Sequence, residues 1–147
     1  MSGRLVMDDL EHDEDFSPTR AYGTAKLANI LFTKELHARF HDLGVSAAAF
    51  RPGNVATGFA TESDSLLRHV TTNPVARALM SSPEKAAGQL VWLAETTPGI
   101  DWESRVYYEK RKPARRTSKQ ADDEGLARQL WDRSEALLAR TGPARRT

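Results

Sequence analysis

The sequence contains no cysteine, which excludes disulfide bonds, thiolate catalysis and zinc sites built on cysteine. It also lacks an apolar run of the roughly 20 residues that a membrane-spanning helix needs, and it shows no apolar core of a secretory signal peptide. The charges nearly cancel, because 21 Lys and Arg residues face 20 Asp and Glu residues. Without a strong net field, nucleic acid and membrane surfaces are not expected partners. We therefore expect a cytoplasmic protein with no membrane span.

The composition is typical of a globular chain. Its 147 residues are 39% hydrophobic and 28% charged, and a chain of this length can bury a substantial core.

The clearest helix signal covers residues 18–43. Ser17 and Pro18 are suited to the N-cap and the first helical position, because a hydroxyl can accept a free N–H and proline has none to lose. Gly44 is a suitable stop. Apolar residues recur at helical spacing between these ends, at Leu27, Ile30, Leu31, Leu36, Phe40 and Leu43.

The remaining segments alternate between strand and helix signals. Short apolar runs predict strands at 45–50, which we expect to be buried, and at 105–109. Further helices are expected from Ser82-Pro83 up to Pro98-Gly99 and over about 119–140, with partly helical structure over 64–80. This alternation predicts an α/β architecture with a parallel pair of strands.

Tyr22 and Lys26 are spaced to share one face of the first helix. A free phenol ionises with a pKa of about 10, so proton transfer near neutral pH requires roughly 4 kcal/mol of stabilisation. An ammonium about 5 Å away supplies roughly 3 kcal/mol at an effective dielectric constant near 20, and under about 1 kcal/mol in water. The pair can therefore serve as an acid–base pair only where water is excluded. Spacing alone leaves open that the two side chains are unrelated.

The stretch "RPGNVATGF", residues 51–59, follows the first predicted strand. A Pro-Gly turn and a threonine at the carboxyl end of a parallel strand are typical of a ligand-binding loop in α/β folds. Apolar residues beyond it are equally compatible with a substrate pocket and with ordinary packing, namely Phe59, Leu66, Leu67 and Val70.

Together, Tyr22-x-x-x-Lys26 and Pro52-Gly53-Asn54-Val55-Ala56-Thr57 resemble the C-terminal half of a short-chain dehydrogenase/reductase. The stretches "GRLVMDDL", "AYGTAKLANILFTKEL" and "RVYYEKRKPAR" are similar to the retinol-dehydrogenase-like branch. The resemblance covers nearly the whole chain. It implies part of a Rossmann-type doubly wound parallel sheet, with about two strands and three to four helices. Residues 1–17 would form an acidic lead-in loop, and residues 18–147 one partial domain.

The resemblance also implies the chemistry. Tyr22 would be the proton donor or acceptor as hydride passes between NAD or NADP and an alcohol or carbonyl substrate, which we expect to be lipophilic. Lys26 would make the phenol easier to ionise and hold the ribose hydroxyls of the cofactor. Pro52 and Gly53 would lie beside the nicotinamide. The backbone at Val55 and the hydroxyl of Thr57 would bind its carboxamide.

The sequence departs from the family pattern in three places. Nothing matches the glycine-rich turn that holds the pyrophosphate, the asparagine motif, or the strand that carries the catalytic serine. Ser2 falls after the position of that serine. We therefore expect the nucleotide-binding half to be absent and this chain alone to be inactive, and marginally stable, sticky or dimeric. The alternative is a non-catalytic remnant that pairs through helix 18–43 with a second copy or an intact relative.

Other candidate sites have simpler explanations. His37 and His41 share a helix face but lack a third ligand, so we favour a solvated surface over a metal site. The acidic run over 8–15 lacks the spacing of a calcium loop, and the basic run over 110–116 is expected to be a solvated connection. Trp131 is expected to anchor the core.

Overall fold

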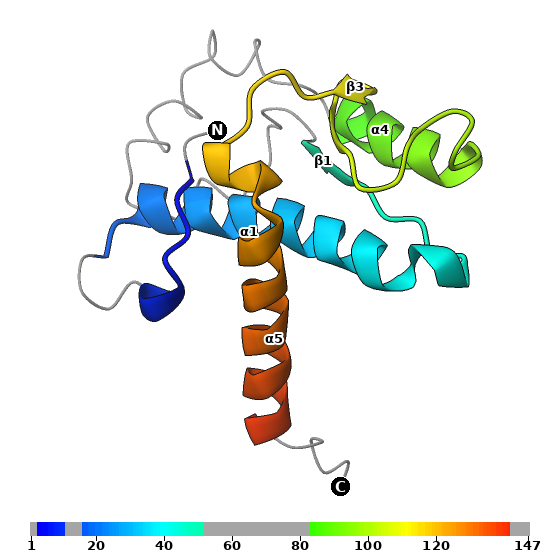
Figure 1. Ribbon diagram of the computed structural model, residues 1–147. Helices are drawn as coiled ribbons and strands as arrows, with labels where there is room; N and C mark the ends of the chain where they lie inside the picture. The colour runs from blue at the N-terminus through cyan, green and yellow to red at the C-terminus, as the bar shows by residue number, and fades with distance from the viewer. Residues whose placement is uncertain (1–2, 11–15, 52–82, 142–147) are drawn as a thin grey trace, which may run out of the picture. The chain divides into compact units, whose positions relative to one another are not determined.

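The computed structural model describes residues 3–10, 16–51 and 83–141 (Figure 1). The chain forms two compact units. The first comprises residues 1–49, 103–106 and 114–147, and the second comprises residues 50–102 and 107–113. The predicted helical segment over 64–80 lies outside the described residues.

Helix α1 (Pro18–Phe40) is the longest element of the first unit. It continues into a 3₁₀ turn, η2 (His41–Leu43), and ends at Gly44, whose φ of 88° is the left-handed conformation that favours glycine. The predicted helix over 18–43 is therefore confirmed. The predicted role of the Ser17 hydroxyl is wrong, because this side chain makes no capping hydrogen bond. The carbonyl oxygen of Ser17 instead accepts from the N–H of Ala21 at 2.9 Å.

Helix α5 (Glu124–Thr141) packs against α1 and closes the core of this unit. The expected single helix over 119–140 is interrupted, since η4 (Lys119–Asp122) is a separate 3₁₀ turn. Asp123 explains the break, because its Oδ1 accepts from the N–H of Leu126 at 2.9 Å and so caps α5. The core of the first unit is made by side chains with at most 9% exposure, namely Leu5, Leu27, Ile30, Leu31, Ala121, Leu126 and Ala127.

Trp131 of α5 packs on the side of α1, as expected. Its ring stacks on Phe32 at a centroid distance of 5.0 Å and contacts Phe40 at 5.9 Å. The Arg39 guanidinium lies 5.2 Å from the indole ring and bridges Glu35 and Asp132 at 2.7 Å each. These contacts fix the crossing of the two helices.

A small sheet has the order β1-β2-β3. Strand β1 (Ala49–Arg51) is next to β2 (Tyr107–Glu109), which pairs antiparallel with β3 (Lys112–Pro113). The prediction of a buried strand over 45–50 is wrong in extent and burial, because β1 is shorter and half exposed. As an edge strand of the described sheet it has a neighbour on one side only. Strand β3 was not predicted.

The turn between β2 and β3 has an unusual composition. Lys110 and Arg111 have φ values of 53° and 61°, and two-residue hairpins of this shape normally carry Asn-Gly. Helix α4 (Pro83–Glu95) holds the turn. Gln89 Oε1 accepts from the N–H of Lys110 at 2.9 Å, and Arg111 Nη2 donates to the carbonyl oxygen of Gly88 at 3.1 Å.

The predicted α/β class is confirmed, since a small sheet is combined with three α-helices in the described residues. This content is consistent with part of a Rossmann-like fold. Among the described helices, none combines the length and apolar character required to cross a bilayer.

Candidate active site

Tyr22 and Lys26 lie side by side in the first turns of α1. The ammonium Nζ of Lys26 is 5.4 Å from the centroid of the Tyr22 ring. The Tyr22 side chain is 60% exposed, whereas Lys26 is half-buried. The helical spacing therefore brings a phenol and a cation into contact on an open face of the first unit.

The beginning of α1 is held by a close backbone contact with the extended segment 3–6. A Cβ atom at Gly3 would lie 2.1 Å from the carbonyl oxygen of Gly23, and one at Gly23 would lie 3.3 Å from Gly3 Cα. Thr24, which is 7% exposed, donates from its hydroxyl to the carbonyl oxygen of Arg4 at 2.7 Å. The residues directly after Tyr22 are thus fixed by backbone packing that leaves no room for a side chain.

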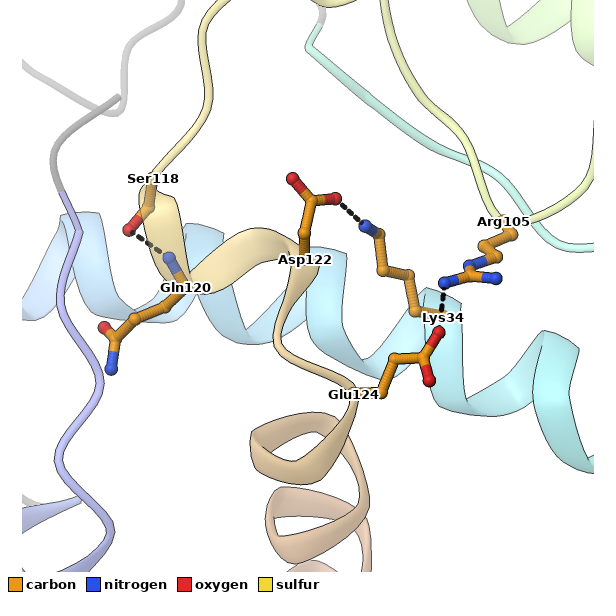
Figure 2. A network of polar contacts seen from close by, with 6 residues as sticks. All are labelled: Lys34, Arg105, Ser118, Gln120, Asp122 and Glu124. Carbon is orange, nitrogen blue, oxygen red and sulfur yellow. Dashed lines mark hydrogen bonds and ion pairs between the residues drawn. The ribbon is translucent and has the colours of Figure 1, made fainter.

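Gln120 of η4 holds the other side of this segment. Its Oε1 accepts from the N–H of Leu5 at 2.9 Å, and its Nε2 donates to the carbonyl oxygen of Leu5 at 3.0 Å. Figure 2 shows Gln120 beside Ser118, whose hydroxyl accepts from the Gln120 N–H at 3.4 Å. Because an amide supplies both a donor and an acceptor, this one side chain satisfies the backbone of buried Leu5 as a neighbouring strand would. We call this pair of hydrogen bonds the Gln120 clamp.

Two ion pairs lie near the Gln120 clamp. Lys34 pairs with Asp122, and Arg105 Nη2 pairs with Glu124 Oε1 at 2.6 Å (Figure 2). Asp122 and Glu124 are well exposed, at 81% and 68% of the side chain. The Arg105–Glu124 pair is exposed on both sides, and such pairs contribute about 0–1 kcal/mol. In the other pair only Asp122 is exposed, since the Lys34 side chain is 14% exposed.

The electrostatic effect of Lys26 on Tyr22 depends on how much water reaches them. In general, a cation about 5 Å from a phenolate oxygen stabilises it by roughly 3 kcal/mol at an effective dielectric constant near 20, and by under about 1 kcal/mol in water. Tyr22 is 60% exposed, so water screens its interaction with Lys26.

The other residues predicted for the site lie outside the described residues. These are Pro52, Gly53, Val55 and Thr57. The apolar residues left open between a substrate pocket and ordinary packing also lie outside the described residues, namely Phe59, Leu66, Leu67 and Val70. Sequence reasoning missed the supporting residues Gly3 and Gln120. Gly23, directly after Tyr22, was the one local signal that another backbone segment packs closely against α1 at this point.

Comparison with known proteins gives the family context. No family model matches the chain. It is similar to human retinol dehydrogenase 14, with 33% identity over 137 residues that make up 92% of this chain and 40% of that protein. It is also similar to human retinol dehydrogenase 13, with 31% identity over 148 residues. This alignment covers 98% of this chain and 44% of that protein.

A plant enzyme shows the same pattern. Protochlorophyllide reductase A of Oryza sativa subsp. japonica is 32% identical over 133 residues, which are 85% of this chain and 34% of that protein. The chain thus spans less than half the length of these relatives. The resemblance noted from the sequence motifs is confirmed over most of the chain.

Proposed function

This chain is a homologue of the retinol dehydrogenases and related short-chain dehydrogenase/reductases, and on that premise we propose that it carries the proton-transfer residues of a nicotinamide-dependent oxidoreductase. The observation that carries the proposal is the contact between Lys26 and Tyr22 on one face of α1. The substrate class is an alcohol or carbonyl compound with a lipophilic body.

The proposed chemistry divides between cofactor and chain. A bound NAD(H) or NADP(H) would supply a hydride to the carbonyl carbon during reduction and would take one from the alcohol carbon during oxidation. Tyr22 donates its phenolic proton to the carbonyl oxygen during reduction and takes a proton from the alcohol during oxidation. Lys26 stabilises the phenolate by its charge and holds the ribose hydroxyls of the cofactor. The two side chains are one helical turn apart, so Tyr22 would reach the reacting oxygen while Lys26 would supply a cation to the cofactor.

Pro52, Gly53, Val55 and Thr57 would bind the nicotinamide end of the cofactor in this proposal. The 147 residues contain no glycine-rich turn for the pyrophosphate. We therefore propose that this chain alone is inactive, because one end of the dinucleotide lacks its binding loop and Tyr22 is open to water.

Inactivity of the isolated chain is tested by titrating NADH and NADPH into the purified protein. We expect no binding at micromolar cofactor. Micromolar binding to the isolated chain would contradict this part of the proposal and leave the assignment of Tyr22 untouched.

The role of Tyr22 is tested in a chimera. This chain would replace the homologous segment of human retinol dehydrogenase 14, and retinol oxidation would be followed by NADH or NADPH absorbance. We expect activity in the chimera and a loss of about 10²- to 10⁴-fold in kcat on Tyr22→Phe, the usual contribution of general acid–base catalysis. The matched control is Tyr108→Phe, because Tyr108 lies on β2 and is no part of the proposed site. Equal loss in both variants would refute the proposed role.

A further inference from the structure

Thr24 makes its side-chain hydrogen bond outside the helix that contains it. A threonine within a helix can donate its hydroxyl hydrogen to the carbonyl oxygen four residues earlier in the same helix. Thr33 of α1 does so, because its Oγ1 donates to the carbonyl oxygen of Asn29 at 2.8 Å. Thr24 is also buried in α1, but its Oγ1 donates to the carbonyl oxygen of Arg4 at 2.7 Å. This hydrogen bond ties the first turns of α1 to the segment 3–6.

The hydrogen bond of Thr24 lies on the side of α1 opposite to Tyr22 and Lys26. Successive residues are about 100° apart around a helix axis, so Tyr22 and Lys26 differ by about 40° and Thr24 is about 160° from each. The exposures agree, since the Thr24 residue is 7% exposed and Tyr22 is 60% exposed. A hydrogen bond on the buried side of a helix determines the direction in which the opposite side faces. Thr24 therefore fixes the direction in which Tyr22 and Lys26 project.

The acceptor of this hydrogen bond belongs to a segment that is itself held on both sides. Leu5, which follows Arg4, is bound by the Gln120 clamp. Gly3, which precedes Arg4, packs against α1 so closely that a Cβ atom there would lie 2.1 Å from the carbonyl oxygen of Gly23. Because both neighbours of Arg4 are fixed, its carbonyl oxygen can restrain a rotation of α1 instead of following it.

We propose that Thr24 is a positioning residue for proton transfer by Tyr22, and that it acts by fixing the rotation of the first turns of α1. The inference rests on the proposed function and adds a residue on the side of α1 opposite to the proposed chemistry. A rotation of about 10° moves an atom that is about 6 Å from the helix axis by about 1 Å. A displacement of about 1 Å at a reacting group can lower the rate by about a hundredfold. One buried hydrogen bond is therefore sufficient to affect the reaction on the exposed side.

The test compares two buried threonines of α1 in the chimera with human retinol dehydrogenase 14. Thr24→Val removes the hydrogen bond to Arg4 and keeps the branched shape of the side chain. Thr33→Val is the matched control, because Thr33 is 8% exposed and its hydrogen bond stays within the helix. Both variants should lower the Tm of the chimera.

Only the variant at Thr24 should change catalysis. We expect Thr24→Val to lower kcat for retinol oxidation by about tenfold or more, and to change the KM for retinol by less than about twofold. Thr33→Val should leave kcat within about twofold of the parent. Thr24→Ser keeps the hydroxyl group and should restore most of the lost kcat.

Equal losses of kcat in Thr24→Val and Thr33→Val would overturn the proposal, because they would reflect destabilisation alone. A kcat of Thr24→Val equal to that of the parent would also overturn it. If Thr24→Val does not fold, Thr24→Ala takes its place with the same expected loss, because alanine removes the hydroxyl and is the residue most favourable to a helix.

Tyr22→Phe in the same chimera separates this inference from the proposed function. If Tyr22→Phe loses activity while Thr24→Val keeps it, only the role of Thr24 is wrong. Full activity in Tyr22→Phe, or a chimera without activity, would overturn the proposed function and this inference with it.

Discussion

Replacing Gln120 by glutamate changes one polar group of a side chain that makes two hydrogen bonds to Leu5. The carboxylate keeps the acceptor for the Leu5 N–H. It loses the donor to the Leu5 carbonyl oxygen and places a negatively charged oxygen there. Because Leu5 is 2% exposed, water cannot easily replace the lost donor.

The expected loss of stability follows from the free-energy cost of a buried polar group that has no hydrogen-bond partner. One unsatisfied carbonyl costs about 1–3 kcal/mol, so Gln120→Glu should lower the free energy of unfolding by that amount near pH 7. Gln120→Met keeps the size of the side chain and removes both hydrogen bonds, and it should cost about twice as much. Ser118→Ala is the matched control on the same turn, because it removes only a 3.4 Å contact, and we expect less than about 0.5 kcal/mol.

Protonation provides an internal check on the mechanism. In the Gln120→Glu variant, the introduced carboxyl group can donate its O–H to the Leu5 carbonyl oxygen when it is neutral, and so replace the lost bond. The folded state therefore favours the neutral form, and the pKa of this carboxyl should be raised above the usual value of about 4.3. The stability difference between the variant and the parent should shrink as the pH falls through the raised pKa.

The assay is urea unfolding followed by tryptophan fluorescence and circular dichroism, at neutral pH and near pH 4.5. Comparing each variant with the parent at the same pH removes the effects of other titrating groups. If Gln120→Glu unfolds at the same urea concentration as the parent at neutral pH, the Gln120 clamp does not exist. A difference that persists unchanged at acid pH would show that the lost donor is not its cause.

Three further predictions concern the first unit and the hairpin. Burial, followed by the charges of His41 and Arg105, lowers the pKa of His37 in the folded chain. The unfolded chain therefore binds a proton at this histidine more readily. The free energy of unfolding is retained above pH about 6.5 and falls as the pH decreases toward the lowered pKa. His37→Gln should flatten this dependence in urea unfolding with chelator present. Gly3→Ala should destabilise by about 1–3 kcal/mol, since its Cβ would lie 2.1 Å from a backbone oxygen; an unchanged unfolding midpoint would argue against the contact. Lys110→Asn should stabilise the chain by up to about 1 kcal/mol, because φ is 53° there, and a thermal melt would test it.

Local sequence patterns predicted the long first helix and the contact between Tyr22 and Lys26. The limits of α1 follow from Pro18 and Gly44, whose backbone preferences act within one turn of the helix. Tyr22 and Lys26 meet because four residues make about one helical turn, which needs no tertiary contact. The break before α5 was missed although Asp123 is a capping residue. The apolar spacing that predicted the helix begins only at Leu126, after this break.

The sequence by itself determined the long helix α1 and which two side chains share its first turns. The tertiary structure decided what holds those turns, through Gly3 against Gly23 and Gln120 against Leu5. Gln120 and Leu5 are 115 positions apart. Neither residue type indicates from the sequence that it forms such a long-range hydrogen bond. Helical periodicity acts over a few residues, whereas a contact of this kind forms only after the chain has brought distant backbone groups together and removed them from water.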